Sequence, residues 1–255
     1  MKSEKKDLYI ITGGSKGLGS AIAENALLKN QCVITISRSE NKNMQLKKIK
    51  SENQSENLIQ IKHDLSVAFS ETEKMLNYIF KKINFKNCQN IYFINNAAQI
   101  QPVSEIGKLN TTEIQKHIYL NYTVPVLLTN WLMSKKTNHK GYKVITQISS
   151  GAASFAITNW SIYCSSKAAI EMFNSVMQIQ LEKNKKVKAF TYAPGIIDTG
   201  MQAVIRGLKK SDFPEVSRFK EYKKTNELRS ADSVADHLMK ILSKPEKITQ
   251  KSYSI

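Results

Sequence analysis

Tyr163 and Lys167 lie four positions apart, a spacing that places both side chains on one face of a helix. A tyrosine with the ordinary pKa of about 10 exchanges protons poorly at neutral pH, but a neighbouring ammonium group favours the phenolate and lowers that pKa. Ser150 follows an apolar run at 142–148, where its hydroxyl can hydrogen-bond a carbonyl oxygen. A Tyr/Lys pair alone is usually structural. With a strand-end serine and a nucleotide-binding loop, it predicts acid–base chemistry at a carbonyl group.

A glycine-rich stretch near the start of the chain has the features of such a loop. An apolar, β-forming run at 8–11 turns through Thr12-Gly13-Gly14-Ser15-Lys16-Gly17-Leu18-Gly19 into a helical pattern. The first-turn N–H groups of a helix lack internal partners, and the helix dipole adds positive charge, so this turn can bind a phosphate. The stretch therefore predicts dinucleotide binding, with a tight structural turn as the alternative.

Two other glycine motifs fit this stretch less well. A P-loop requires Lys-Ser or Lys-Thr after the last glycine, where the chain has Ser20-Ala21. The G-x-S-x-G pattern at 13–17 matches the nucleophile elbow of α/β-hydrolases, but that elbow needs earlier strands for its oxyanion hole. Too few residues precede Ser15 to form those strands, so hydrolase chemistry is not favoured.

The end of the second predicted strand, 32–38, would face the adenosine ribose of a bound dinucleotide. A site that prefers NAD has an acidic residue there, whereas this chain has Ser37-Arg38-Ser39. A guanidinium and a hydroxyl suit a 2′-phosphate, and Lys16 can reach the same place. These residues favour NADP(H); the alternative is that Arg38 is an ordinary surface residue.

Alternating strand and helix patterns predict an α/β fold, a doubly wound parallel sheet (Rossmann fold) formed as a single domain over 1–255. The expected strands are 8–11, 32–38, 58–65, 90–94, 142–148, 187–193 and an edge strand within 248–255. Helical patterns cover 111–137, a segment from 163, and 231–242, with Met44, Leu46 and Ile49 as weak helical anchors. The charged segment 198–226, with few large apolar residues, is expected to be a substrate loop or lid.

Polar residues at strand ends and inside one helix are further candidates. Asp64 can accept from an adenine amino group or cap the helix that begins near residue 70. In Asn95-Asn96-Ala97 the amides can hold a turn, and the alanine leaves room for a flat ligand. Asn121 lies mid-helix, and Pro125 lacks the N–H that would bond its carbonyl, which leaves that carbonyl available to a water. A tolerated kink is the alternative for Asn121.

The composition excludes several other classes. The formal net charge is +17, but the lysines are spread along the chain, so nucleic-acid binding is not expected. We expect no membrane span, no signal peptide and a cytoplasmic location, because apolar runs are short and the first residues are charged. Three distant cysteines indicate reduced thiols, and scattered histidines predict no metal site.

Together these motifs resemble those of the short-chain dehydrogenases/reductases, over essentially the whole chain. The matching residues occur in the order and spacing of that family: Thr12-Gly13-x-x-x-Gly17-x-Gly19, Asn95-Asn96-Ala97, Asn121, Ser150, Tyr163-x-x-x-Lys167 and Pro194-Gly195-x-x-x-Thr199. The resemblance implies that Tyr163 donates the proton and Ser150 positions the substrate oxygen. It also implies that Lys167 binds the nicotinamide ribose and lowers the pKa of Tyr163, and that the Asn121 carbonyl holds a relay water.

The resemblance implies a set of ligand contacts as well. For NADP(H) they are Gly13, Ser15, Lys16, Gly17, Leu18, Gly19, Ser37, Arg38, Asp64, Leu65, Asn95, Ala97, Tyr163, Lys167, Pro194, Gly195, Ile197 and Thr199. For the substrate they are Ser150, Phe155, Trp160, Tyr163 and Met201.

Within the family, segments 150–153, 160–167, 198–206 and 228–230 are similar to the bacterial benzil reductases that form (S)-benzoin, relatives of the sepiapterin reductases. This implies NADPH-dependent reduction of an α-diketone such as benzil to an (S)-α-hydroxyketone. It also implies a homodimer, with a tetramer as the alternative, paired through the helices at 111–137 and 163–183.

Three other functions remain open on the sequence. Sepiapterin reductases hold the pterin with an acid near the C-terminus, whereas the last acid here is Glu246, which counts against a pterin. An electropositive surface would suit 3-oxoacyl-carrier-protein reduction. An NADPH-sensing regulator would be expected to have a disabled Tyr/Lys pair, and both residues are present.

Overall fold

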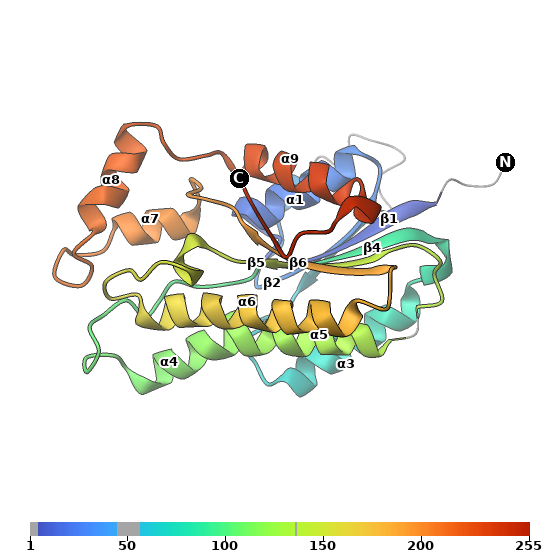
Figure 1. Ribbon diagram of the computed structural model, residues 1–255, viewed down its shortest axis with the longest axis horizontal. Coiled ribbons are helices and arrows are strands. Elements are labelled where there is room, and N and C mark those ends of the chain that lie inside the picture. Colours follow the sequence, from blue (N-terminus) through green and yellow to red (C-terminus); the bar gives the residue numbers. More distant parts are fainter. Residues whose placement is uncertain (1–4, 45–56, 136) are drawn as a thin grey trace.

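Helices flank a seven-stranded sheet in the computed structural model, which describes residues 5–44, 57–135 and 137–255 (Figure 1). Neighbouring strands all pair in parallel, in the order β3-β2-β1-β4-β5-β6-β7. The strands are β1 Lys6–Thr12, β2 Cys32–Ser37, β3 Leu58–Lys62, β4 Cys88–Asn95, β5 Lys143–Ile148, β6 Val187–Ala193 and β7 Ser252–Ser254. The predicted doubly wound parallel sheet is confirmed, although β3 ends at Lys62 and not at residue 65.

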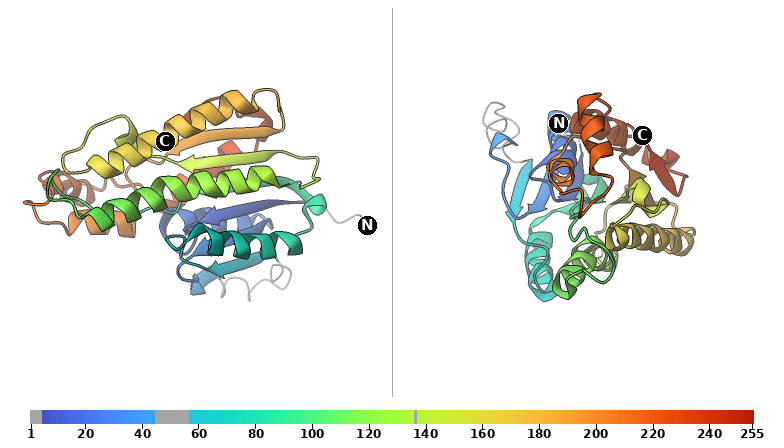
Figure 2. Two further views of the ribbon diagram at one scale, coloured as in Figure 1. Left: turned by 90° about the horizontal axis from the view of Figure 1, so that it is seen from below. Right: turned by 90° about the vertical axis from the view of Figure 1, so that its left-hand side faces the viewer.

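The helices form a layer on each side of the sheet (Figures 1 and 2). One face carries α1 Gly17–Leu28 and α9 Ala231–Leu242, and the other carries α3 Phe69–Lys82, α4 Thr111–Ile118, α5 Val124–Ser134 and α6 Ser161–Leu181. Two short helices, α7 Gly200–Arg206 and α8 Val216–Lys224, lie beyond the carboxyl ends of the strands. Short 3-10 turns occur at Phe85–Asn87, Gly151–Ala153 and Pro245–Lys247.

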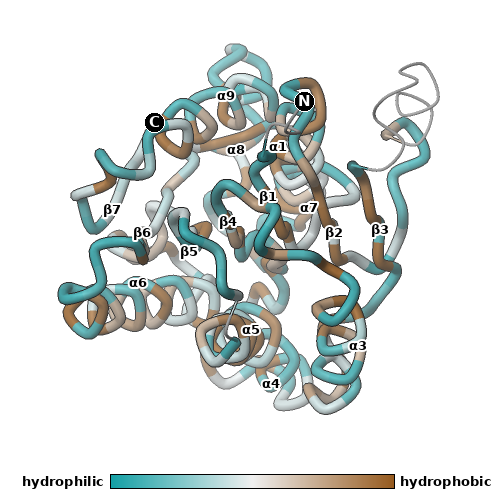
Figure 3. The backbone as a smooth tube through the Cα atoms, turned by 90° about the vertical axis from the view of Figure 1, so that its right-hand side faces the viewer, coloured by the Kyte–Doolittle hydropathy of each residue, from teal (hydrophilic) through white to brown (hydrophobic). Residues whose placement is uncertain are grey.

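Strand β1 supplies both hydrophobic cores, because successive side chains point to opposite faces of a sheet. Tyr9 and Ile11 pack with α1 and α9, while Leu8 and Ile10 pack toward α3 and α5. Figure 3 looks toward the amino ends of the strands and shows the two helical layers on either side. Met44 is buried in the first core, and the other anchors expected after it, Leu46 and Ile49, lie outside the described residues.

The segment 111–137 differs from the single helix that the sequence predicts. A π-helical turn at Tyr119–Thr123 separates α4 from α5. The N–H of Val124 bonds the carbonyl of Tyr119, five residues back, and Pro125 stands in the first turn of α5. Asn121 is therefore in a π turn, a local irregularity that is frequent at functional sites.

The segment 198–226 folds as α7 and α8 and is more firmly packed than its composition predicts. Phe213, Val216 and Phe219 are buried against Trp160. The rings of Trp160 and Phe213 are stacked, with centroids 5.1 Å apart and planes at 16°. A few well-placed aromatic residues thus dock this segment, which we name the α7–α8 cap (residues 198–226).

Candidate active site

The topology brings most of the predicted site residues to one edge of the sheet. Because all strands are parallel, the glycine loop after β1, Asn95 at the end of β4, Ser150 after β5 and the loop 194–199 after β6 meet at the carboxyl edge. The chain order reverses between β1 and β4. Open α/β sheets bind ligands at such a switch point.

The glycine loop has little room for side chains, as a dinucleotide cradle requires. A Cβ on Gly19 would lie 2.4 Å from the carbonyl oxygen of Gly13, so the loop packs directly on the first turn of α1. Gly17 has a φ of +57°, and a Cβ there would lie 3.3 Å from the Thr199 side chain. The loop and the segment after β6 are thus neighbours. These features fit the predicted phosphate site.

Thr12 and Asn96 fix the glycine loop against the end of β4. The Thr12 hydroxyl accepts from the N–H groups of Asn96 and Ala97 at 2.9 and 3.0 Å. The Asn96 amide donates to the carbonyls of Thr12 and Gly13 at 3.0 and 3.2 Å. The expected turn-holding role of the paired amides is met by Asn96. The Thr12 contact was not anticipated, although the polar residue at the end of an apolar strand was a usable signal.

Asn95 and Asp64 lie at strand ends, with contacts that differ from those expected. The Asn95 amide is buried and donates to Thr129 on α5 at 3.2 Å, while its Oδ1 has no partner among the described residues. Asp64 accepts from the N–H and hydroxyl of Ser66 at 2.9 and 2.7 Å, whereas the N-cap of α3 is Ala68. The interpretation of Asp64 as the cap of that helix is therefore wrong. Its adenine contact, and any cofactor contact of Asn95, stay predictions.

The end of β2 lies beside the glycine loop. The hydroxyls of Ser39 and Ser15 are 3.3 Å apart, and buried Ser37 donates to the Ser39 carbonyl at 2.9 Å. Lys16 and Arg38 are both exposed. The bonds from Ser66 hold the pKa of Asp64 below its usual range, and the positive charge of Arg38 adds to this effect. The two segments that carry the predicted ribose-phosphate residues are therefore neighbours.

Ser150, Tyr163 and Lys167 meet between β5 and α6. The Ser150 hydroxyl accepts from the N–H of Ala152 at 3.2 Å, and its interaction with Tyr163 lowers the pKa of that tyrosine. Lys167 donates to the carbonyl of Ile148 at 2.8 Å, and its Nζ lies 5.7 Å from the centre of the Tyr163 ring. Tyr163 and Lys167 are only 6% and 4% exposed. The Tyr163 phenol and the Lys167 amine are thus held beside the Ser150 hydroxyl in a largely desolvated site.

The pKa of Tyr163 differs in direction from the expectation based on the sequence. Burial raises the pKa of Tyr163 to about 12, against the opposing hydrogen bond with Ser150. Burial also lowers the pKa of Lys167 to about 8. The lowering of the Tyr163 pKa that we expected from Lys167 is therefore not found, and burial determines the direction of the shift. At neutral pH the phenol keeps its proton, which suits a group that donates one.

Glu171 is a residue of this region that the sequence reasoning missed. Ser149 donates to its carboxylate at 2.7 Å, and its negative charge raises the pKa of Lys167 against the effect of burial. Glu171 lies four residues after Lys167, so it shares the same helical face. That spacing was a usable signal. The Ser149–Glu171 bond ties the end of β5 to α6.

Asn121 clamps the loop that follows β4. Its Oδ1 accepts from the N–H of Gln99 at 2.9 Å, and its Nδ2 donates to the Gln99 carbonyl at 2.8 Å. Because the side chain is engaged in this way, only the main-chain carbonyl fits the predicted water-holding role, and that role stays a prediction.

The predicted contact loop 194–199 is anchored to Arg229, which follows the α7–α8 cap. The Arg229 N–H donates to the carbonyl of Ile196 at 3.0 Å, and the Asp198 N–H donates to the carbonyl of Arg229 at 2.9 Å. Gly195 has a φ of +68°, a conformation that favours glycine. Asp198 also forms ion pairs with Arg206 at 3.5 Å and Lys223 at 2.5 Å.

The predicted substrate residues divide into buried and exposed ones. Trp160 is buried, and its ring meets that of Tyr163 edge to face with centroids 5.4 Å apart. Met201 packs against the same aromatic cluster. Phe155 is 72% exposed. Its main-chain carbonyl accepts a hydrogen bond from the thiol of Cys164, the residue after Tyr163. The wall beside Tyr163 is therefore aromatic.

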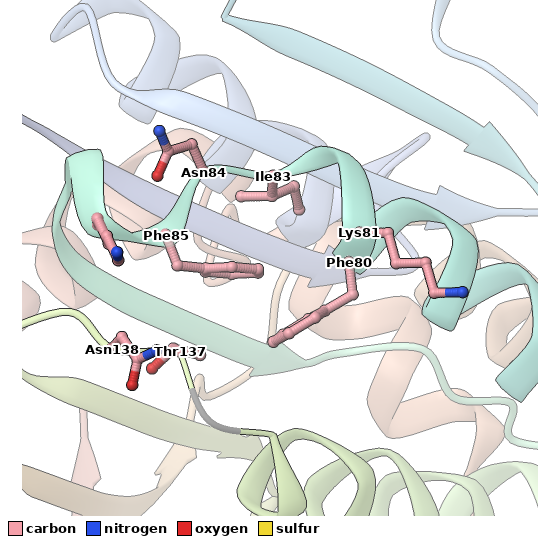
Figure 4. Close-up of a pocket in the computed structure, with 8 residues that line it drawn as sticks. Phe80, Lys81, Ile83, Asn84, Phe85, Thr137 and Asn138 are labelled. Carbon is pink, nitrogen blue, oxygen red and sulfur yellow. The ribbon is translucent and has the colours of Figure 1, made fainter.

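A shallow pocket lies at the opposite edge, where β4 and β5 begin (Figure 4). It measures about 440 Å³ and is lined by Phe80, Lys81, Ile83, Asn84, Phe85, Lys86, Thr137 and Asn138. None of these residues was a site candidate. In the described parts of the chain no helix is long and apolar enough to span a bilayer, and no cluster of metal-ligating side chains occurs.

Comparison with known proteins agrees with this geometry. The family model of the short chain dehydrogenases matches residues 7–209, and the chain belongs to that family. It is 37% identical to a benzil reductase ((S)-benzoin forming) of Bacillus subtilis (strain 168), over 93% of this chain and 94% of the relative. The rat (Rattus norvegicus) sepiapterin reductase is 29% identical over 92% of this chain and 90% of its own.

Solved structures share the fold. A short chain dehydrogenase/reductase from Saccharomyces cerevisiae superimposes with a TM-score of 0.79 at 25% identity, over 97% of this chain and 95% of its own. The chain is accordingly an oxidoreductase of the short-chain dehydrogenase/reductase type that acts on CH–OH or C=O groups.

Proposed function

We propose that this protein is an NADPH-dependent carbonyl reductase that converts an α-diketone of the benzil type to an (S)-α-hydroxyketone. The observation that carries the proposal is the convergence of Ser150, Tyr163 and Lys167 beside an aromatic wall. The similarity to benzil reductases over nearly the whole chain supports the same substrate class.

The side chains can share the work of carbonyl reduction. NADPH, when bound, supplies the hydride to the carbonyl carbon. The Ser150 hydroxyl hydrogen-bonds the carbonyl oxygen, and Tyr163 donates its proton to that oxygen. Lys167, buried and close to the ring, stabilises the phenolate that forms. Because burial keeps Tyr163 protonated at neutral pH, the arrangement favours reduction.

The proposed choice of NADPH rests on charge at the end of β2. Lys16 and Arg38 are exposed beside Ser15, Ser37 and Ser39, where an NAD site would carry an acid. A guanidinium forms paired hydrogen bonds with phosphate. The cradle of the glycine loop can hold the diphosphate of either cofactor, so selectivity depends on this pair of cations.

The aromatic wall favours a flat, apolar dicarbonyl over a pterin. Trp160, Phe213 and Phe219 form an aromatic cluster next to Tyr163, in which Trp160 and Phe213 are stacked and Phe219 is tilted. Aromatic pairs gain about 0.5–1.5 kcal/mol beyond their buried area, which a benzil ring can use. The similarity to sepiapterin reductases keeps a pterin side-chain carbonyl as the second candidate.

The direct test is NADPH oxidation with benzil, 1-phenyl-1,2-propanedione, sepiapterin and a 3-oxoacyl thioester, with chiral analysis of the products. We expect turnover of the two diketones and an (S)-hydroxyketone from benzil. Turnover of sepiapterin alone would select the second candidate. No turnover of any dicarbonyl would refute the substrate class.

We also propose that the protein is a homodimer. Met172, Val176 and Ile179 lie along one face of α6 and are 66%, 47% and 67% exposed. An apolar stripe at helical spacing on a long helix suits a second copy of the same helix. Light scattering on Met172→Lys should show a monomer where the unaltered chain gives a dimer.

A further inference from the structure

His117 occupies the last turn of α4, directly before the π-helical turn, and its side chain is fully buried. Its ring and that of Tyr163 meet edge to face, with centroids 6.0 Å apart and planes at 87°. The proposed proton transfer does not use this imidazole, although it lies next to the proton donor.

The partners of the imidazole define its protonation. Nδ1 lies 2.6 Å from the carbonyl oxygen of Gln101, which can only accept, so Nδ1 carries a proton. The two Gln99 bonds fix the Asn121 amide so that its Nδ2 is the donor, and this Nδ2 lies 2.9 Å from Nε2. Nε2 therefore accepts, and His117 is neutral.

The same nitrogen also reaches α6. Ser166 Oγ lies 3.1 Å from Nε2 and 2.8 Å from the carbonyl oxygen of Tyr163, and its single proton can be donated to either of these two acceptors. His117 thus connects the loop before α4, through Gln101, with the π turn, through Asn121, and with the turn of α6 that carries Tyr163. Each of these segments borders or contains a predicted site residue.

A positive charge on His117 would break its hydrogen bond with Asn121. An Nε2–H would point at the amide N–H of Asn121, so two donors would face each other. Burial lowers the pKa of His117, and the charge of Lys167 lowers it further, against the bond to Gln101. The facing titratable groups are Tyr163 and Lys167 on α6, while the loop and the π turn present the uncharged Gln101 carbonyl and Asn121 amide.

We propose that His117 is a positioning residue, a neutral hydrogen-bond acceptor that holds Asn121 and the Tyr163 turn in register for proton transfer and releases Asn121 when it is protonated. Its effect on turnover rests on the proposed carbonyl reduction. Its neutral, Nδ1-protonated form does not, and can be tested without any substrate.

Three substitutions separate the two nitrogens. His117→Gln retains an acceptor near the place of Nε2, His117→Asn retains a donor near the place of Nδ1, and His117→Phe keeps only the ring. We expect kcat to fall about 10- to 100-fold in the Asn and Phe variants, because small misplacements of reacting groups are that costly, and to recover in the Gln variant. The His117→Gln and His117→Asn variants should have similar KM values for NADPH and similar melting temperatures. If kcat were unchanged in His117→Asn and reduced in His117→Gln, the acceptor role of His117 would be overturned.

The pH profile of kcat provides a second readout. In the unaltered enzyme kcat should decrease at pH values below about 6.5, the ordinary pKa of histidine, as His117 becomes charged. This acidic fall should be absent in His117→Gln. His139, whose pKa burial also lowers, bonds the Tyr142 carbonyl away from the site, so His139→Gln is the matched control and should keep the fall. An unchanged profile in His117→Gln would refute the switch.

Long-range ¹H–¹⁵N NMR of the imidazole rings tests the tautomer directly. The signal that disappears in His117→Gln should have the neutral, Nδ1-protonated pattern at pH 7. An Nε2-protonated or charged ring would overturn the proposal, whatever the enzyme reduces. If the ring is as expected but no carbonyl compound is turned over, the proposed function fails and the acceptor role of His117 stands.

Discussion

The two halves of the carboxyl edge are built from different materials. Around β1 and β4, the site consists of backbone, glycines and short polar side chains that leave space, with Gly19 packed on the Gly13 carbonyl and Asn96 bonded to Thr12 and Gly13. Around β5 and β6, large side chains fill space, from the buried Tyr163 and Lys167 to the aromatic cluster of the α7–α8 cap. The first half suits a ligand common to many enzymes, and the second a particular substrate.

Removing the Tyr163 hydroxyl should separate the halves most clearly. Tyr163→Phe keeps the ring and its contact with Trp160 but loses the proton donor. We expect kcat to fall about 10²- to 10⁴-fold, the usual contribution of a general acid, with NADPH affinity unchanged. Stopped-flow turnover and NADPH fluorescence titration measure the two effects. Retained turnover would remove Tyr163 from its role.

The packing of the α7–α8 cap can be broken independently of the cofactor half. Phe213 is fully buried, so Phe213→Ala should destabilise the fold by about 3–5 kcal/mol and raise KM for benzil more than KM for NADPH. Urea unfolding and steady-state kinetics measure both. Leu28, 76% exposed on α1, is the control: Leu28→Ala should change stability by less than about 0.5 kcal/mol.

In the cofactor half, a steric clash rather than the loss of a contact should weaken NADPH binding. A methyl group at Gly19 would lie 2.4 Å from a backbone oxygen, so Gly19→Ala should weaken NADPH binding at least about tenfold, or about 1.4 kcal/mol. At Gly207 the nearest atoms to an added Cβ are 3.5 Å away, and Gly207→Ala should bind NADPH normally. Calorimetric titration distinguishes the two variants. Equal affinities would contradict the close packing of the loop.

Cofactor choice should respond to charge at one position. Arg38→Glu places an acid where an adenosine ribose prefers one, so we expect NADPH affinity to fall about tenfold or more while NADH binds equally or better. Ratios of kcat/KM for the two cofactors provide the measurement. A surface change elsewhere, Arg218→Glu on α8, serves as the charge-matched control. An unaltered cofactor ratio in Arg38→Glu would refute the proposed phosphate contact.

The smallest expected effect concerns pH. Since the pKa of Lys167 is about 8, activity should decline above that pH as the ammonium is lost. The charge of Glu171 raises this pKa, so Glu171→Gln should move the decline to lower pH, and Glu182→Gln at the end of α6 should not. The stability of the fold changes with pH in the opposite direction to the activity. Unfolded Lys167 takes up its proton more readily than the folded residue, so this group makes the fold more stable as pH rises from about 8 toward 10.5.

The difference between the halves also explains what the sequence could predict. Glycine spacing, strand periodicity and the Tyr/Lys interval are local, so the sheet, the cradle and the pairing of Tyr163 with Lys167 were accessible. The balance that sets the Tyr163 pKa depends on burial by distant segments. Likewise, Phe213 and Phe219 become core residues only because Trp160 lies opposite. The π turn at Asn121 changes hydrogen-bond registry, which periodicity does not reveal.

The paired backbone bonds between Asp198, Ile196 and Arg229 have a consequence for how such enzymes diversify. They close the α7–α8 cap into a loop whose two ends are fastened at one point beside β6. A loop with fixed, adjacent ends can be lengthened or replaced at small entropic cost, because closure entropy grows only with the logarithm of its length. New substrates could therefore be acquired by exchanging this one segment, as a removable module, while the sheet that holds the cofactor stays unaltered.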